Sequence, residues 1–171
     1  MTGLFSFPNP VNDAAARTVA LGVVTLSGLT FVTGWAWLLV PLTYGFLARV
    51  LTGPTLSPLG QFAVRVAGPR LVSWQKFVPG PPKRFAQGIG LLFSSSALIT
   101  WLSAGWPVAR WILLPLIAAA ALEGFLGFCL GCTMFGWLIR WGVIPDSVCA
   151  DCGDLAARWA KKPPAGASSH T

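Results

Sequence analysis

Two long stretches of the chain carry no charged side chain, and they limit the possible folds more than any other feature. The first runs from Thr18 to Ala48 and the second from Phe85 to Ala109. Hydrophobic residues make up 54% of the sequence and charged residues only 10%. A helix needs roughly 20 apolar residues to cross a bilayer, and lipid cannot satisfy the open edges of strands. The sequence therefore predicts an all-α membrane protein.

The lengths of these stretches predict a four-transmembrane-helix bundle. Residues 18–48 as one helix would measure roughly 46 Å, which is too long for a bilayer core of roughly 30 Å. Gly34 lies near the middle, so we expect a tight turn at Thr33-Gly34 between two short helices. The predicted spans are 17–33, 35–51, 84–104 and 107–140. A break of the last helix near Gly124 would instead give five spans.

We expect the membrane bundle to take residues 1–145. Its central loop is rich in Pro and Gly, and the stretches 59–67 and 70–77 mix apolar residues with Arg, Lys and Gln. That mixture predicts short interfacial helices. Residues 146–162 would form a cytoplasmic segment with a CxxC, and 163–171 a disordered tail. Asn12 or Asp13 is expected to cap the first helix at its N-terminus.

Basic residues gather on one side of the predicted spans, in the central loop between Arg49 and Arg84 and in the C-terminal segment. The positive-inside rule then places both termini and the central loop in the cytoplasm, for a multi-pass protein of the cell inner (plasma) membrane. Anionic headgroups of the lipid bilayer account for the net charge of +7, and we expect no nucleic-acid partner. Lys83 and Arg84 are interpreted as anchors of this kind, with phosphate binding as the alternative.

The cysteines give the strongest functional lead. All four occur in two CxxC pairs, Cys129 with Cys132 and Cys149 with Cys152. The first pair lies inside the last predicted span, at a depth of roughly 12–16 Å if the helix is continuous to Arg140. The second pair lies in the cytoplasmic segment. Three interpretations of this pattern stay open.

In the first interpretation the protein is a membrane-embedded dithiol protein. Cys129 and Cys132 would form the buried end of a thiol–disulfide electron relay, and Cys149 and Cys152 would meet a cytoplasmic thioredoxin-like or rhodanese-like (sulfurtransferase) partner. The geometry of the buried pair is a difficulty. In an unbroken helix the two Cβ atoms would be roughly 5–6 Å apart, whereas a disulfide needs roughly 3.5–4.5 Å.

In the second interpretation the four thiolates hold a zinc or iron ion, in a non-catalytic membrane subunit, an interaction protein or part of a larger membrane complex. The spacing fits a tetrathiolate site, but such a site would carry a net charge of about −2, which is costly within lipid. In the third interpretation the cysteines are small packing residues. No hydrolase triad, P-loop, dinucleotide-binding or haem motif occurs, so the sequence leaves open whether the chain is an enzyme.

Glu123 is the one acidic residue within the predicted spans. An ionisable side chain inside a membrane is a functional candidate by default, so Glu123 could relay protons; a packing role is the alternative. On a continuous helix it would lie about 120° around the axis from Cys129 and would not touch it. Gly127 and Gly131 have the spacing of a small-residue helix-packing motif on that same helix.

Three sequence motifs, which follow one another in the right order along the chain, resemble those of one bacterial family. They are residues 9–13 leading to Arg17, residues 80–90 (GPPKRFAQGIG), and residues 122–132 (LEGFLGFCLGC). Together they are similar to the membrane family catalogued as domain of unknown function 4395, over about residues 8–140, and the second CxxC pair resembles its actinobacterial branch. The resemblance implies a four-helix integral membrane protein. It also implies genetic association with thioredoxin-like or rhodanese-like proteins, which favours thiol redox or sulfur handling.

Overall fold

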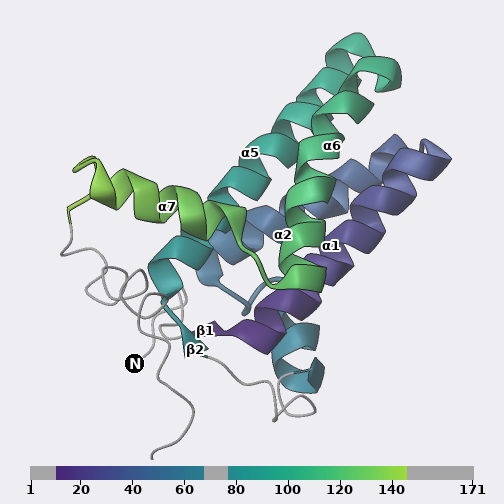
Figure 1. Cartoon of the computed structure of the whole chain (residues 1–171). Coiled ribbons are helices and arrows are strands. Elements are labelled where there is room, and N and C mark those ends of the chain that lie inside the picture. The colour runs from purple at the N-terminus through teal and green to yellow at the C-terminus, as the bar shows by residue number, and fades with distance from the viewer. Residues whose placement is uncertain (1–10, 68–76, 146–171) are drawn as a thin grey trace, which may run out of the picture.

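The computed structural model describes residues 11–67 and 77–145 (Figure 1). Its α-helices in this part of the chain are α1 (Asp13–Thr33), α2 (Leu39–Thr52), α3 (Pro58–Phe62), α5 (Gly80–Ala104), α6 (Trp106–Ala121) and α7 (Leu130–Arg140). Shorter helical turns are a 3-10 turn, η1 (Ala36–Leu38), and two π-helical turns, η2 (Ala63–Ala67) and η4 (Leu122–Leu126). Two short strands, β1 (Val11–Asn12) and β2 (Phe77–Val78), pair in antiparallel fashion.

Three of these helical segments are long and apolar enough to cross a membrane: Asp13–Thr33, Gly80–Ala104 and Trp106–Leu126. Residues Ala36–Thr52 form a shorter apolar helical segment. The predicted helical fold with apolar helices of membrane-spanning length is therefore confirmed. The central loop also contains helix, in α3 and η2, within the stretch 59–67 where one was predicted. Most of the second predicted loop helix, 70–77, lies outside the described residues.

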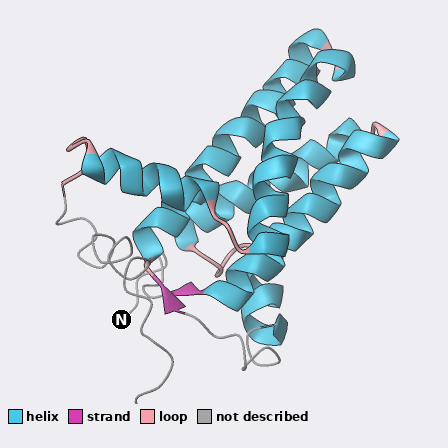
Figure 2. Ribbon diagram, in the orientation of Figure 1, coloured by secondary structure: helices cyan, strands magenta, loops and turns pink. Residues whose placement is uncertain are grey.

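The helices form two antiparallel pairs that pack side by side (Figures 1 and 2). α1 turns into η1 and α2 at Gly34, which has φ 71°, so the tight turn predicted at Thr33-Gly34 is confirmed. α5 turns into α6 at Gly105. The buried core between the pairs is made mainly of small and aliphatic side chains together with Phe46, and the partly buried rings of Phe93, Trp101 and Trp106 pack against it. Its fully buried members include Leu39, Ala97 and Leu113.

The starts of α1 and α5 are held together by the two strands. Val11 pairs with Val78 and Asn12 with Phe77, directly before each helix begins. The Asn12 side chain also accepts a hydrogen bond of 2.9 Å from the backbone N–H of Ala14, which confirms the predicted N-cap. Asp13 and Lys83, near the starts of the two helices, are thereby brought to the same end of the bundle.

The predicted continuous span 107–140 is wrong. α6 passes into η4, which ends at Gly127 in the left-handed conformation (φ 69°), and α7 begins only at Leu130. In Figure 1, α7 (yellow-green) leaves the end of α6 and runs across the bundle rather than along it. The depth of 12–16 Å expected for Cys129 and Cys132 assumed a continuous helix and no longer applies.

Candidate functional site

The first cysteine pair lies at the start of α7, because the helix break places Cys129 just outside it. Cys129 is the N-cap residue, with extended backbone (φ −90°, ψ 103°). Its Sγ accepts a hydrogen bond of 3.3 Å from the backbone N–H of Cys132. The N-terminus of a helix stabilises negative charge through its free N–H groups and its dipole. The arrangement therefore favours the thiolate form of Cys129.

The two thiols influence each other directly. Both are free and half-buried. A hydrogen bond from the Cys132 side chain lowers the pKa of the Cys129 thiol, and the nearby ammonium group of Lys83 acts in the same direction. The same hydrogen bond, together with burial, raises the pKa of Cys132. The hydrogen bond between the two side chains thus shifts the pKa values of the two thiols in opposite directions.

The geometric objection to this pair is removed by the helix break. It assumed that both cysteines lie within one regular helix, where their side chains diverge. Only Cys132 lies within α7, while Cys129 is in the extended residue before it. The separation expected for two cysteines within one helix therefore does not apply to this pair.

Beside the dithiol lies a group of four charged side chains, which we call the ionic cluster: Asp13, Arg17, Lys83 and Glu123. The Lys83 Nζ atom is 2.7 Å from Glu123 Oε1 and 3.3 Å from Asp13 Oδ1. Arg17 Nε is 3.0 Å from Asp13 Oδ2. Lys83 is only 5% exposed and Asp13 8%. Two positive and two negative groups balance, which is how charges are tolerated at buried positions.

The cluster corrects the interpretation of Lys83 as a surface anchor. Its ammonium group is buried between two carboxylates from α1 and η4 instead of reaching toward headgroups or phosphate. Asp13, Arg17 and Lys83 were not predicted as site residues from the sequence. The family motifs could have pointed to them, because each of these residues lies in the motif at residues 9–17 or the motif at residues 80–90. The structure brings these two motifs together with the third, at residues 122–132.

Two glycines allow the close approach that forms the site. Gly127 has positive φ, and a Cβ on it would collide with the guanidinium group of Arg17. A Cβ on Gly131 would lie 2.5 Å from the Cβ of Ala86 on α5. Gly131 therefore serves helix packing, as expected. Gly127 does not lie on the same helix and instead supplies the turn that Arg17 covers.

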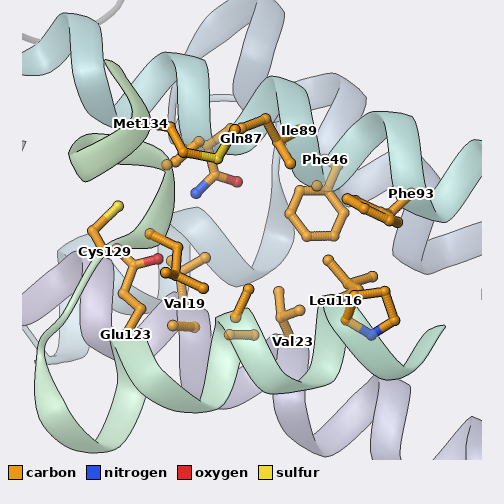
Figure 3. Close-up of a pocket in the computed structure, with 18 residues that line it drawn as sticks. Val19, Val23, Phe46, Gln87, Ile89, Phe93, Leu116, Glu123, Cys129 and Met134 are labelled. Carbon is orange, nitrogen blue, oxygen red and sulfur yellow. The ribbon is translucent and has the colours of Figure 1, made fainter. Parts of the chain in front are cut away.

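Glu123 and Cys129 line one cavity of about 200 Å³ between α1, α5, α6 and α7 (Figure 3). On a continuous helix the two residues would have faced different directions; the turn at Gly127 brings both to the cavity. Most of the remaining wall is apolar and includes Val23, Phe46 and Phe93. The cavity thus has one polar, sulfur-containing end and an apolar body.

Gln87 is the other polar residue in the cavity wall. The buried Arg49 donates a hydrogen bond of 2.8 Å from Nε to Gln87 Oε1, and one of 3.3 Å from Nη1 to Ser57. A guanidinium group has only donors, so it fixes the amide oxygen toward itself. The amide nitrogen of Gln87 then points the other way, toward the side of the cavity where Cys129 lies in Figure 3.

Cys149 and Cys152 lie outside the described residues, so their distance from Cys129 and Cys132 is not defined. Among residues 11–67 and 77–145, no group of three or more Cys, His, Asp or Glu side chains is arranged to hold a metal ion. The two described thiols could supply half of a tetrathiolate site, and the zinc or iron alternative stays a prediction.

The fold and this site together define a helical bundle of membrane type with a helix-capping dithiol beside a buried ionic cluster. The chain belongs to the family described as domain of unknown function (DUF4395), whose model matches residues 11–140. This match covers the ionic cluster and the first CxxC pair, and it confirms the resemblance found in the sequence. No match was found among curated proteins or among solved structures.

Proposed function

We propose that this protein is a membrane dithiol protein that exchanges electrons with a thioredoxin-like or rhodanese-like partner at the cytoplasmic face. The observation that carries the proposal is the position of Cys129 as the cap of α7, with the Cys132 N–H directed at its sulfur at 3.3 Å. A helix N-terminus lowers the pKa of a cysteine thiol at that position, which suits a nucleophilic cysteine.

The proposed reaction is a thiol–disulfide exchange. The Cys129 thiolate attacks one sulfur of a disulfide, forms a mixed disulfide, and releases the other sulfur as a thiolate. Cys132 then loses its proton and attacks the Cys129 sulfur. The products are a Cys129–Cys132 disulfide and a reduced dithiol on the other side. Cys149 and Cys152 are proposed as the surface pair that passes electrons between this site and the soluble partner.

Glu123 is proposed to relay the proton that Cys132 must lose. Its carboxylate is held at the cavity by Lys83, whose Nζ atom is 2.7 Å from Glu123 Oε1. The Asp13 carboxylate shares the same ammonium group from the other side.

The proposed topology has four spans, formed by α1, by η1 with α2, by α5, and by α6 with η4. α7 would then lie along the cytoplasmic interface of the plasma membrane, with both termini on that side. The exposed apolar residues of α7, including Met134 and Trp137, suit such a position. Arg49 and Arg84 would lie at the same face, and Arg110 at the opposite one, in agreement with the positive-inside rule.

The test is to count free thiols and metal in the purified full-length protein before and after mild oxidation. We expect a reversible Cys129–Cys132 disulfide, found by the mass shift on alkylation. The Cys132→Ser variant should trap a mixed disulfide through Cys129 with an oxidised thioredoxin, and Cys129→Ser should trap none through Cys132. Four thiols that stay reduced and bind one zinc or iron ion per chain would overturn the proposal in favour of the metal site.

A further inference from the structure

The cavity next to Cys129 has a combination of features that thiol exchange with a protein partner does not use. About 200 Å³ of space lies between the helices, and its wall is apolar apart from Gln87, Glu123 and Cys129. A protein partner reaches a cysteine from the surface and leaves the interior space unused. An apolar cavity of roughly 150 Å³ is already enough to bind one benzene ring.

The cavity reaches the outer surface of the bundle on an apolar side. Leu130 and Met134 of α7 both line it and are 39% and 48% exposed. Figure 3 shows Met134 at one edge of the cavity and Phe46 and Phe93 on the side away from Cys129. A molecule dissolved in the bilayer could therefore enter between α5 and α7. A water-soluble oxidant such as glutathione disulfide carries several charges that this wall could not solvate.

The polar end of the cavity provides a hydrogen-bond donor and a reactive sulfur atom, the two groups that a flat carbonyl compound would need in order to bind and react there. The Arg49 contact fixes the amide oxygen of Gln87, which leaves the amide N–H groups to donate into the cavity. The activated sulfur, Cys129, lies in the same wall. The rings of Phe46 and Phe93 offer aromatic faces and edges against which a planar ring packs well.

We propose that this cavity binds the ring of a lipid-soluble quinone, which oxidises the Cys129–Cys132 dithiol. This inference rests on the proposed function, because it needs a redox-active pair. The reaction balances with one proton from water: the Cys129 thiolate and the Cys132 thiol lose two electrons and the Cys132 proton as one S–S bond forms. The quinone takes both electrons, that proton and the proton from water to become its hydroquinone. Gln87 would donate a hydrogen bond to one quinone oxygen, and the hydrophobic tail would extend past Met134 into the lipid.

The experiment uses the full-length, fully reduced protein in detergent micelles with a short-tailed naphthoquinone as the probe. Hydroquinone formation is followed by absorbance, and disulfide formation by alkylation and mass spectrometry. Exchange with glutathione disulfide is measured in parallel, since it reports on the dithiol without using the cavity. For the natural sequence we expect one hydroquinone per Cys129–Cys132 disulfide formed.

Ala119→Leu tests the cavity, and Ala118→Leu is its matched control. Ala119 lines the cavity and is half-buried, whereas its neighbour Ala118 is exposed and lies outside the wall. We expect Ala119→Leu to slow quinone reduction about tenfold or more, because the larger side chain would take up cavity space that the quinone ring needs. Ala118→Leu should change it less than about twofold. Both should keep the exchange with glutathione disulfide, and Ala119→Val should give an intermediate rate if Ala119→Leu fails to fold.

The outcomes separate the two proposals. Exchange with glutathione disulfide without any quinone reduction would overturn the quinone site and leave the dithiol function intact. Equal quinone reduction by Ala119→Leu and Ala118→Leu would also overturn it, because the reaction would then occur outside the cavity. A protein that forms no Cys129–Cys132 disulfide with either oxidant would overturn the proposed function and the quinone site together.

Discussion

At one end of the bundle α1 ends at Gly34 with φ 71°, and at the other η4 ends at Gly127 with φ 69°. The two turns have nearly the same backbone conformation but very different surroundings. A Cβ on Gly34 would come no closer than 3.5 Å to the Trp106 side chain, whereas on Gly127 it would collide with Arg17. The first turn only reverses the chain. The second also carries the dithiol and is covered by the ionic cluster.

The comparison shows that local backbone conformation does not make a site. Both turns need a residue that tolerates positive φ, and glycine satisfies this need at each. Charged side chains differ between the ends: the Gly127 end holds Asp13, Lys83 and Glu123 in contact, whereas Arg110 at the Gly34 end lies over the rings of Phe31 and Trp111. Three predictions test how far this difference extends.

The largest effect should come from removing the central cation of the ionic cluster. Lys83→Met would leave the carboxylates of Asp13 and Glu123 buried with one ammonium group fewer, and breaking a buried ion pair costs about 3–5 kcal/mol. Arg110→Met, the control at the other end, should cost about 0.5–1 kcal/mol, because its side chain is exposed and only contacts aromatic rings. Unfolding in detergent micelles, followed by circular dichroism, would compare the two variants. Equal losses would mean that the cluster is not a buried network.

A smaller difference is expected between the two glycine turns. Gly34→Ala should cost about 1–2 kcal/mol, the usual penalty for a side chain in the left-handed region. Gly127→Ala should cost more, because the new methyl group also meets the Arg17 guanidinium. Adding Arg17→Met to the Gly127→Ala variant should recover part of the extra loss of stability that Gly127→Ala shows relative to Gly34→Ala. A double-mutant cycle measures this coupling between positions 17 and 127. No coupling between positions 17 and 127 would contradict the observed packing.

The smallest effect should be on the reactivity of Cys129. Its pKa is lowered chiefly by the hydrogen bond from the Cys132 side chain, so Cys132→Ala should raise the pH midpoint of its reaction with iodoacetamide. The sign follows because a higher pKa means less thiolate at a given pH. Below the midpoint a rise of one unit slows alkylation about tenfold, equal to 1.4 kcal/mol. The backbone N–H of residue 132 remains, so part of the activation should persist. A midpoint that stays the same or falls would show that Cys132 does not activate its neighbour.

Much of the helical framework could be predicted, because it depends on features of contiguous residues. The turn at Gly34 follows from a charge-free stretch too long for one span, and the Asn12 cap follows from its position before an Ala-rich helix start. The break after Leu126 was expected only as an alternative near Gly124. Residues 125–139 are apolar throughout, so hydropathy continues across the break. Hydropathy does not register the left-handed turn at Gly127, which Arg17 of another helix covers.

The site was predicted only in part, for a related reason. The CxxC spacing identified Cys129 and Cys132, and the isolated acid identified Glu123. Lys83 was interpreted from its neighbours in the sequence, which are those of a membrane anchor. Its partners Asp13 and Glu123 are 70 and 40 residues away along the chain. Composition along a contiguous stretch contains no information about such a pairing.

The sequence by itself determined that this chain forms apolar helices with basic residues near their ends and carries its cysteines in CxxC pairs, because hydropathy and spacing are properties of contiguous residues. The tertiary structure decided that α7 turns across the bundle, that Cys129 caps it, and that Lys83 lies between two acids. Those features depend on packing between helices distant in sequence. Burial then requires each charge to find an opposite one, whichever segment supplies it.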